Sequence, residues 1–329
     1  MSDSIDKTTT GLKRVVNYKI LLLIAGLAII YQTFNYILPE KEGEFSPIDV
    51  VLPVVNIVCA IFAFIVARKY SSWVVLGPAY TALGIGFALY SIGEIIWHYY
   101  SIVLKIYPYP SLADIFYFAY YPFTIFHMVR NIKFFRPKIG IRTITWLVGI
   151  PVAILLLYSY FTFQQDEYSL FDYYYGLIFV TAATIRLSLA ILGTQVFKKS
   201  VLASVWSLLA LGVFINTAGD VYYYYLEIFG LYTETHLLNA LWFAAPLIIT
   251  YALYKHLKIK NAVLANIYFD RFLRQMAKPE FEQDLKQALN QISKKVEIDA
   301  SYKTELKKED LVKLIGEVRK GFEIRKDTD

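Results

Sequence analysis

The chain has 329 residues, of which 57% are hydrophobic, 17% are aromatic and only 18% are charged. A soluble core of this size has no room for so many apolar runs of about 20 residues, the length that crosses a bilayer. The formal net charge of +6 comes from cations dispersed among short segments between those runs, which argues against a nucleic-acid partner. The composition therefore predicts an all-α, polytopic helical membrane protein whose first partner is membrane lipid.

The apolar runs predict about eight transmembrane helices, which together form a transmembrane domain over residues 18–257. The expected spans are 18–38, 48–67, 74–104, 112–129, 143–163, 171–196, 202–228 and 237–257. Residues 1–17 form a short tail before the first span. The single cysteine, Cys59, lies inside the second span, so one chain holds neither a disulfide nor a cysteine-based metal site.

The distribution of lysine and arginine orients these spans. Cations gather in the N-terminal tail, in the second, fourth and sixth loops and after the last span, whereas the remaining loops are mostly acidic. Cytoplasmic loops of membrane proteins carry the excess of lysine and arginine. We therefore expect a multi-pass protein of the plasma membrane with both termini in the cytoplasm.

Four ionisable side chains inside the predicted spans are the first candidates for a functional site. Glu94 and His98 lie one turn apart in the third span, and Arg186 lies in the sixth. Asp220 lies in the seventh span, on a polar and aromatic stripe that includes Tyr224. Ionisable groups inside a membrane are costly and commonly mark function. Arg186 keeps its proton, so it needs a counter-ion, for which the sequence offers Glu94 or Asp220.

These charges allow two interpretations. They form an ion-paired cluster that only fixes helix packing, or they line an outward-opening polar pocket for a ligand, proton or cation. Asp114, at the outer start of the fourth span, either joins this pocket or caps its helix together with Ser111. The chain has no metal-binding histidine pair, no nucleophile elbow and no phosphate-binding glycine loop. We therefore expect no metal site and name no catalytic residue or cofactor.

Two hairpins of the predicted bundle share a pattern. Glu94 and Asp220 each follow a glycine and precede an aromatic stretch, and each hairpin ends in an aromatic-alanine signature with Pro122 or Pro246. This correspondence predicts two four-helix halves of the same orientation, related by an axis along the membrane normal. The alternative is that any two membrane hairpins share glycine, proline and aromatic residues.

Residues 258–329 differ in character from the apolar region before them. They are charged, with apolar residues at helical spacing between Phe281 and Val296. This pattern predicts a small helical cytoplasmic tail. Such a tail serves as a small domain, as a stalk that forms a homodimer, or as a segment that docks on a cytoplasmic signalling partner.

One stretch of the chain resembles a known group of membrane modules. Tyr109–Tyr117 reads YPSLADIFY and is followed by Tyr121-Pro122, after a span that contains Gly93-Glu94. These features are similar to the multi-span regions that precede GGDEF, EAL or histidine kinase domains in prokaryotic signalling proteins. The resemblance covers residues 90–125 most specifically and 20–257 more loosely. It implies a sensor module.

The tail departs from that group. It contains no GGDEF or EAL sequence, no phospho-acceptor histidine box and no ATP-binding glycine loop. The resemblance therefore carries over the positions of Glu94, Asp114 and Asp220, without a role for any of them, and an output domain is absent from this sequence.

We therefore expect a sensor or receptor-like membrane protein that binds a small ligand, lipid or ion near Glu94, Arg186 and Asp220 and signals through its tail. One alternative is a carrier whose buried charges couple proton or ion movement to alternating access. The other is a membrane-embedded enzyme that uses Glu94 and His98 as acid and base.

Overall fold

A computed structural model describes residues 16–38, 45–71, 75–135, 140–198 and 200–259. Every regular element within these ranges is helical, which confirms the expected all-α class for this part of the chain. The two predicted tails, 1–17 and 258–329, lie almost wholly outside the described residues.

The eight long helices of the described ranges match the positions of the eight expected spans, with ends that differ by at most six residues. They are α2 (Tyr18–Ile37), α3 (Val51–Lys69), α4 (Leu76–His98), α5 (Leu112–Phe135), α6 (Ile141–Phe163), α7 (Leu170–Phe197), α8 (Ala203–Ile228) and α9 (Asn239–Lys258). A 3-10 turn, η1 (Pro47–Val50), leads into α3, and a π-helical segment, η2 (Tyr99–Leu104), prolongs α4.

Six helical segments are long and apolar enough to cross a membrane. They are Tyr18–Ile37, Pro47–Lys69, Leu76–Leu104, Thr143–Phe163, Leu170–Phe197 and Ala203–Ile228. Helices α5 and α9 are the least apolar of the eight long helices, and α9 ends in a basic turn. The six apolar segments make this a membrane protein of the helical class.

Helices α2 and α6 expose the broadest apolar faces. Only 22% of the apolar window of α2 and 11% of that of α6 is buried within the protein. Leu22 on α2 and Leu156 on α6 are each 65% exposed. Exposed apolar surfaces of this extent mark contact with a membrane or a partner, and hydrocarbon suits helices of this length.

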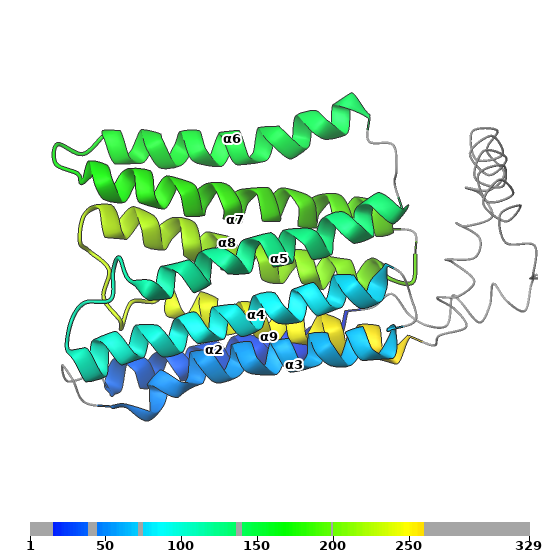
Figure 1. The fold of residues 1–329 in the computed structure, drawn as a ribbon, viewed down its shortest axis with the longest axis horizontal. Coiled ribbons are helices and arrows are strands. Elements are labelled where there is room, and N and C mark those ends of the chain that lie inside the picture. The colour runs from blue at the N-terminus through cyan, green and yellow to red at the C-terminus, as the bar shows by residue number, and fades with distance from the viewer. Residues whose placement is uncertain (1–15, 39–44, 72–74, 136–139, 199, 260–329) are drawn as a thin grey trace, which may run out of the picture. The chain divides into compact units, whose positions relative to one another are not determined.

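Six of the described helices pack as a ring, with α2 and α6 outside it. Figure 1 shows the long helices lying side by side, with α6 at one edge of the bundle. Around the ring, α3 contacts α4, α4 contacts α5, α5 contacts α7, α7 contacts α8, α8 contacts α9, and α9 returns to α3. Helix α2 packs on α9, and α6 packs on α7. We call the end of the ring where α4 connects to α5 and α8 connects to α9 the pocket end.

At the opposite end of the ring, a lysine links two helices. The Lys69 ammonium, in the last turn of α3, donates hydrogen bonds to the carbonyl oxygens of Leu257 (2.7 Å) and Ile259 (2.9 Å). The last carbonyls of a helix have no partner within it, so a cation there satisfies them and suits the negative end of the helix dipole. Lys69 therefore joins the end of α3 to the end of α9.

Candidate functional site

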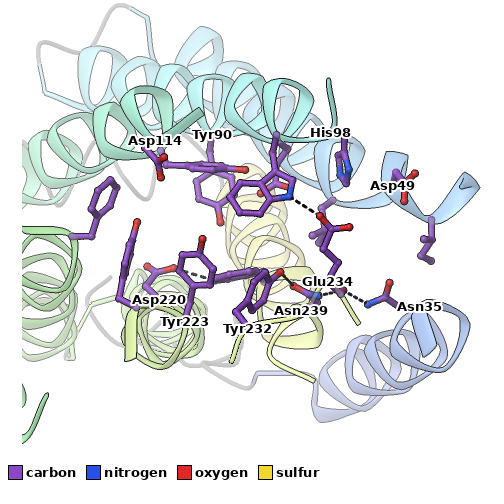
Figure 2. Close-up of a pocket in the computed structure, with 18 of the residues that line it drawn as sticks. Asn35, Asp49, Tyr90, His98, Asp114, Asp220, Tyr223, Tyr232, Glu234 and Asn239 are labelled. Carbon is purple, nitrogen blue, oxygen red and sulfur yellow. Dashed lines mark hydrogen bonds between the residues drawn. The ribbon is translucent and has the colours of Figure 1, made fainter. Parts of the chain in front are cut away.

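A cavity of about 80 Å³ lies at the pocket end (Figure 2). One water needs about 10–15 Å³ of such space, so the cavity has room for several waters or one small molecule. Described residues of α2, α3, α4, α5, α7, α8, α9 and the α8–α9 loop contribute to its wall. Its carboxyl groups belong to Asp49, Glu94, Asp114, Asp220 and Glu234. Its aromatic side chains include Tyr31, Trp97, Tyr117, Tyr223, Tyr232 and Trp242.

In the α4–α5 hairpin, a glycine lets an aromatic ring reach the acid beside it. A Cβ atom on Gly93 would lie 2.7 Å from the Tyr117 ring, which is closer than real Cβ contacts allow. The Tyr117 side chain interacts with the carboxyl group of Glu94, the residue after the glycine. Glu94 is only 6% exposed, so the phenol replaces water that the carboxyl group has lost.

The α8–α9 hairpin repeats this arrangement. A Cβ atom on Gly219 would lie 2.8 Å from the indole nitrogen of Trp242. That nitrogen donates a 3.0 Å hydrogen bond to Oδ1 of Asp220, the residue after the glycine. A glycine, an acid and an aromatic donor from the next helix therefore occur in the same order and the same contact in both hairpins.

A second pair of glycines, seven residues earlier in each hairpin, also corresponds. A Cβ atom on Gly86 would lie 3.2 Å from Thr124 Cγ2, and one on Gly212 would lie 2.5 Å from Ile249 Cγ1. Gly86 and Gly212 are 126 positions apart, as are Glu94 and Asp220. Their partners on α5 and α9, Thr124 and Ile249, are 125 positions apart, as are Tyr117 and Trp242. The two hairpins thus pack in one register.

Arg186 lies beside Asp220, one of the two counter-ions that the sequence offered. Its Nη2 is 3.5 Å from Oδ2 of Asp220 and donates a 2.5 Å hydrogen bond to Oδ1 of Asn216. The guanidinium carbon lies 4.8 Å from the ring centre of Tyr120 and 5.0 Å from that of Tyr121. The Arg186 side chain is completely buried. Stacking on two phenol faces and pairing with a carboxylate let this cation remain in the interior.

Asp220 is the centre of a dense network. Besides Arg186, its carboxylate accepts hydrogen bonds from the hydroxyl of Tyr121 (2.9 Å), from the indole of Trp242 (3.0 Å) and from the amide of Asn216 (3.3 Å). A carboxylate offers about four acceptor positions. This carboxylate therefore has its acceptor capacity filled by the protein.

Asp114 combines the two roles that the sequence left open. Its Oδ2 accepts a 2.7 Å hydrogen bond from the backbone nitrogen of Ser111, and the Ser111 hydroxyl accepts a 3.1 Å bond from the backbone nitrogen of Ala113. These reciprocal bonds cap the start of α5. The same side chain lines the cavity (Figure 2).

His98 and Tyr224 also line the cavity. His98 lies within electrostatic range of Asp49, whose carboxylate accepts a 2.7 Å hydrogen bond from the backbone nitrogen of Ser46 before α3. The Tyr224 ring stacks on Phe179 of α7, with 4.7 Å between ring centres. All the sequence candidates except Arg186 therefore belong to the cavity wall, and Arg186 stands behind Asp220.

Sequence reasoning missed Asp49 and Glu234 as members of the site. The backbone oxygen of Glu234, in the α8–α9 loop, accepts hydrogen bonds from the side-chain amides of Asn35 (2.9 Å) and Asn239 (Figure 2). Its carboxylate accepts longer bonds from Trp97 (3.3 Å) and Ser101 (3.4 Å). Burial raises the pKa of the Glu234 carboxyl group above its usual value. Only its place in a loop between two apolar runs could have drawn attention to it.

The acids of this cavity do not converge on one point. Within the described ranges, no group of three or more histidine, cysteine, aspartate or glutamate side chains has the geometry to hold a metal ion. No family model, no curated protein and no solved structure matches this chain.

Proposed function

We propose that this protein is an integral membrane sensor or receptor-like protein that binds a small ligand in the cavity and signals through residues 258–329. The observation that carries the proposal is the cavity itself. Side chains from both hairpins and from the α8–α9 loop meet there and leave space that protein does not fill. Binding sites between helices of bundles commonly have this form, with apolar walls and a few placed polar groups.

We propose further that all eight long helices span the membrane. Helix α5 has 24 residues and α9 has 20, which at about 1.5 Å per residue gives about 36 Å and 30 Å, enough for a hydrocarbon core of about 30 Å. Both helices belong to the ring, where neighbouring helices cover part of their surface. A ring helix can therefore be less apolar than α2 or α6. The Trp242 and Tyr117 contacts support two related halves.

The orientation follows from the same charges as before. The pocket end carries Glu234, whereas Arg68, Lys69, Lys255 and Lys258 lie at the other ends of α3 and α9. With the positive-inside rule, these charges support the proposal that the cavity faces outward and both termini are cytoplasmic, in a protein of the plasma membrane.

Ligand retention tests the binding part of the proposal. The purified full chain in lipid nanodiscs is incubated with the small-molecule fraction of its host's spent culture medium, washed, and denatured for mass spectrometry. We expect one class of compound to be retained by the parent and lost in Ile48→Trp, which fills the cavity wall. The matched control is Ile178→Trp on α7, where the isoleucine is 56% exposed. Equal retention by both variants, or none by the parent, would contradict the proposal.

Truncation after Lys260 tests the signalling part. A sensor predicts that the shortened chain still retains the compound but no longer changes the activity of a cytoplasmic partner. Retained signalling without residues 261–329 would contradict a role for the tail.

A carrier is the second candidate, because the ring places similar hairpins on opposite sides of one cavity, as in transporters built from repeats. A carrier predicts uptake into proteoliposomes that requires Asp220 and ceases when the proton gradient is dissipated. Such uptake would replace the pure sensor with a carrier.

A further inference from the structure

The chemical class of the ligand can be read from the cavity wall, on the basis of the ligand-binding function proposed above. Among the described lining residues there are ten aromatic side chains, five carboxyl groups and one imidazole, with no lysine or arginine. Aromatic faces are negative and carboxylates are anions, so both attract a positive guest. This composition disfavours an anionic ligand.

Three of the five carboxyl groups already have structural roles, as helix caps or as a counter-ion. Asp49 and Asp114 each accept a 2.7 Å hydrogen bond from a backbone nitrogen at the start of a helix. Asp220 pairs with Arg186 and accepts three further hydrogen bonds. Each of these three acids has at least one hydrogen bond of 2.7–3.0 Å within the protein, so Glu94 and Glu234 are the acids left to meet a guest.

The carboxyl groups of Glu94 and Glu234 have fewer or longer contacts with polar groups of the protein. Tyr117 is the described polar partner of Glu94, which leaves most of the acceptor positions of that carboxyl group for other donors. Glu234 accepts from Trp97 at 3.3 Å and from Ser101 at 3.4 Å, beyond the usual range of about 2.7–3.2 Å. Both side chains line the cavity.

Four aromatic rings form a connected cluster beside these two acids. Tyr223 is at its centre, with ring-centre distances of 4.8 Å to Tyr232, 5.3 Å to Trp242 and 6.4 Å to Trp97. All four rings line the cavity. An aromatic cage of this kind is a recurrent site for alkylated ammonium ions.

We propose that the cavity binds a small organic ammonium ion, with its charge near Glu94 and Glu234 and its alkyl groups against the rings of Trp97, Tyr223 and Tyr232. A bare metal ion does not fit, because the described acids form no converging ligand set and the remaining wall is aromatic. The cavity volume of about 80 Å³ limits the guest to a few heavy atoms beyond the ammonium centre.

A matched pair of probes tests the positive charge directly. Choline and 3,3-dimethylbutan-1-ol have the same shape, but only choline is a cation. Each is titrated into the purified full chain in lipid nanodiscs, and intrinsic tryptophan fluorescence is followed because Trp97 and Trp242 line the cavity. We expect saturable binding of choline, competition by tetramethylammonium, and at least about tenfold weaker binding of the neutral alcohol.

Substitutions then locate the binding site. Glu94→Gln keeps the shape of the side chain and should weaken choline binding at least about tenfold, whereas Glu167→Gln changes an exposed glutamate before α7 and should leave it unchanged. Glu234→Gln, on a loop, provides a second variant if Glu94→Gln does not fold.

Two results would overturn the inference in different ways. Equal affinity for choline and its neutral isostere would show that the positive charge of the ligand does not contribute to binding. The cavity would then still be a ligand-binding site. No saturable binding of choline or tetramethylammonium, or the same loss in Glu167→Gln as in Glu94→Gln, would exclude an ammonium site and leave the retention experiment as a separate test of ligand binding.

Discussion

The α4–α5 and α8–α9 hairpins use one local arrangement for two different purposes. In each, a glycine admits an aromatic ring whose donor reaches the acid that follows, Glu94 in one and Asp220 in the other. In the second hairpin, Arg186 and three further donors fill the carboxylate of Asp220. The described donor to Glu94 is one phenol. The same motif therefore anchors helices where a cation is adjacent and leaves an acid with fewer partners where none is.

The cause of this difference lies in the order of helices around the ring. Arg186 is on α7, which packs against α8 and α5. It therefore meets Asp220 on α8 and the rings of Tyr120 and Tyr121 on α5. Glu94 is on α4, which packs against α3 and α5. Helix neighbours, rather than the glycine-acid pair, decide which acid is neutralised.

Arg186→Met should have the largest effect on stability. It removes the cation that distinguishes the surroundings of Asp220 from those of Glu94. We expect the free energy of unfolding to fall by about 3–5 kcal/mol, because Asp220 then remains buried without its counter-ion. The measurement is SDS-induced unfolding in mixed micelles, followed by circular dichroism. The double variant Arg186→Met with Asp220→Asn should recover most of the loss. A fully stable single variant would show that the pair contributes nothing.

Alanine at the two glycines should have the next largest effect and tests whether the hairpins are equivalent. Gly93→Ala and Gly219→Ala each place a Cβ atom within 2.8 Å of an aromatic ring, and we expect losses of about 1–3 kcal/mol from the overpacking. Gly149→Ala on α6 is the control, because nothing lies within 4 Å of its Cβ. It should be neutral or stabilising by up to about 1 kcal/mol. A loss in only one hairpin would refute their equivalence.

Trp242→Phe removes one donor from Asp220 and keeps the ring. We expect a loss of about 1–2 kcal/mol, since hydrogen bonds to charged groups are stronger than neutral ones. Trp146→Phe on α6, where the indole is 62% exposed, should change little. Unfolding of both variants is compared in the same micelles. Equal stability of Trp242→Phe and the parent would mean that the other donors suffice for Asp220.

Glu94→Gln should have the smallest effect on stability. Together with Asp220→Asn, it compares the two acids of the hairpins directly. We expect a change within about 0.5 kcal/mol or a small gain, because the amide keeps the shape and polarity of the side chain and costs less to bury than a carboxylate. Asp220→Asn, by contrast, leaves Arg186 without its counter-ion and should cost about 3 kcal/mol or more. If both changes had the same effect, Glu94 would be a structural acid like Asp220.

Some of the site could be predicted from the chain and some could not. Glu94, His98, Asp114, Asp220 and Tyr224 were found because each departs from a local pattern, namely an acid or polar group in an apolar run or a capping residue before a helix. Asp49 lies at the very start of the expected span 48–67 and Glu234 lies in the loop before α9, and acids are ordinary at both kinds of place. Nothing local marks them, and the packing of α2, α3 and α9 brings them to the cavity.

The sequence by itself determined the helices of this protein, because the length of an apolar run and its polar boundaries are local properties. It also found the paired glycine-acid motifs, which recur at a constant offset. Tertiary structure alone decided that Arg186 pairs with Asp220 and that five acids share one cavity. These outcomes depend on which helices become neighbours, and side-chain contacts between helices are set by the closing of the whole ring rather than by any single segment.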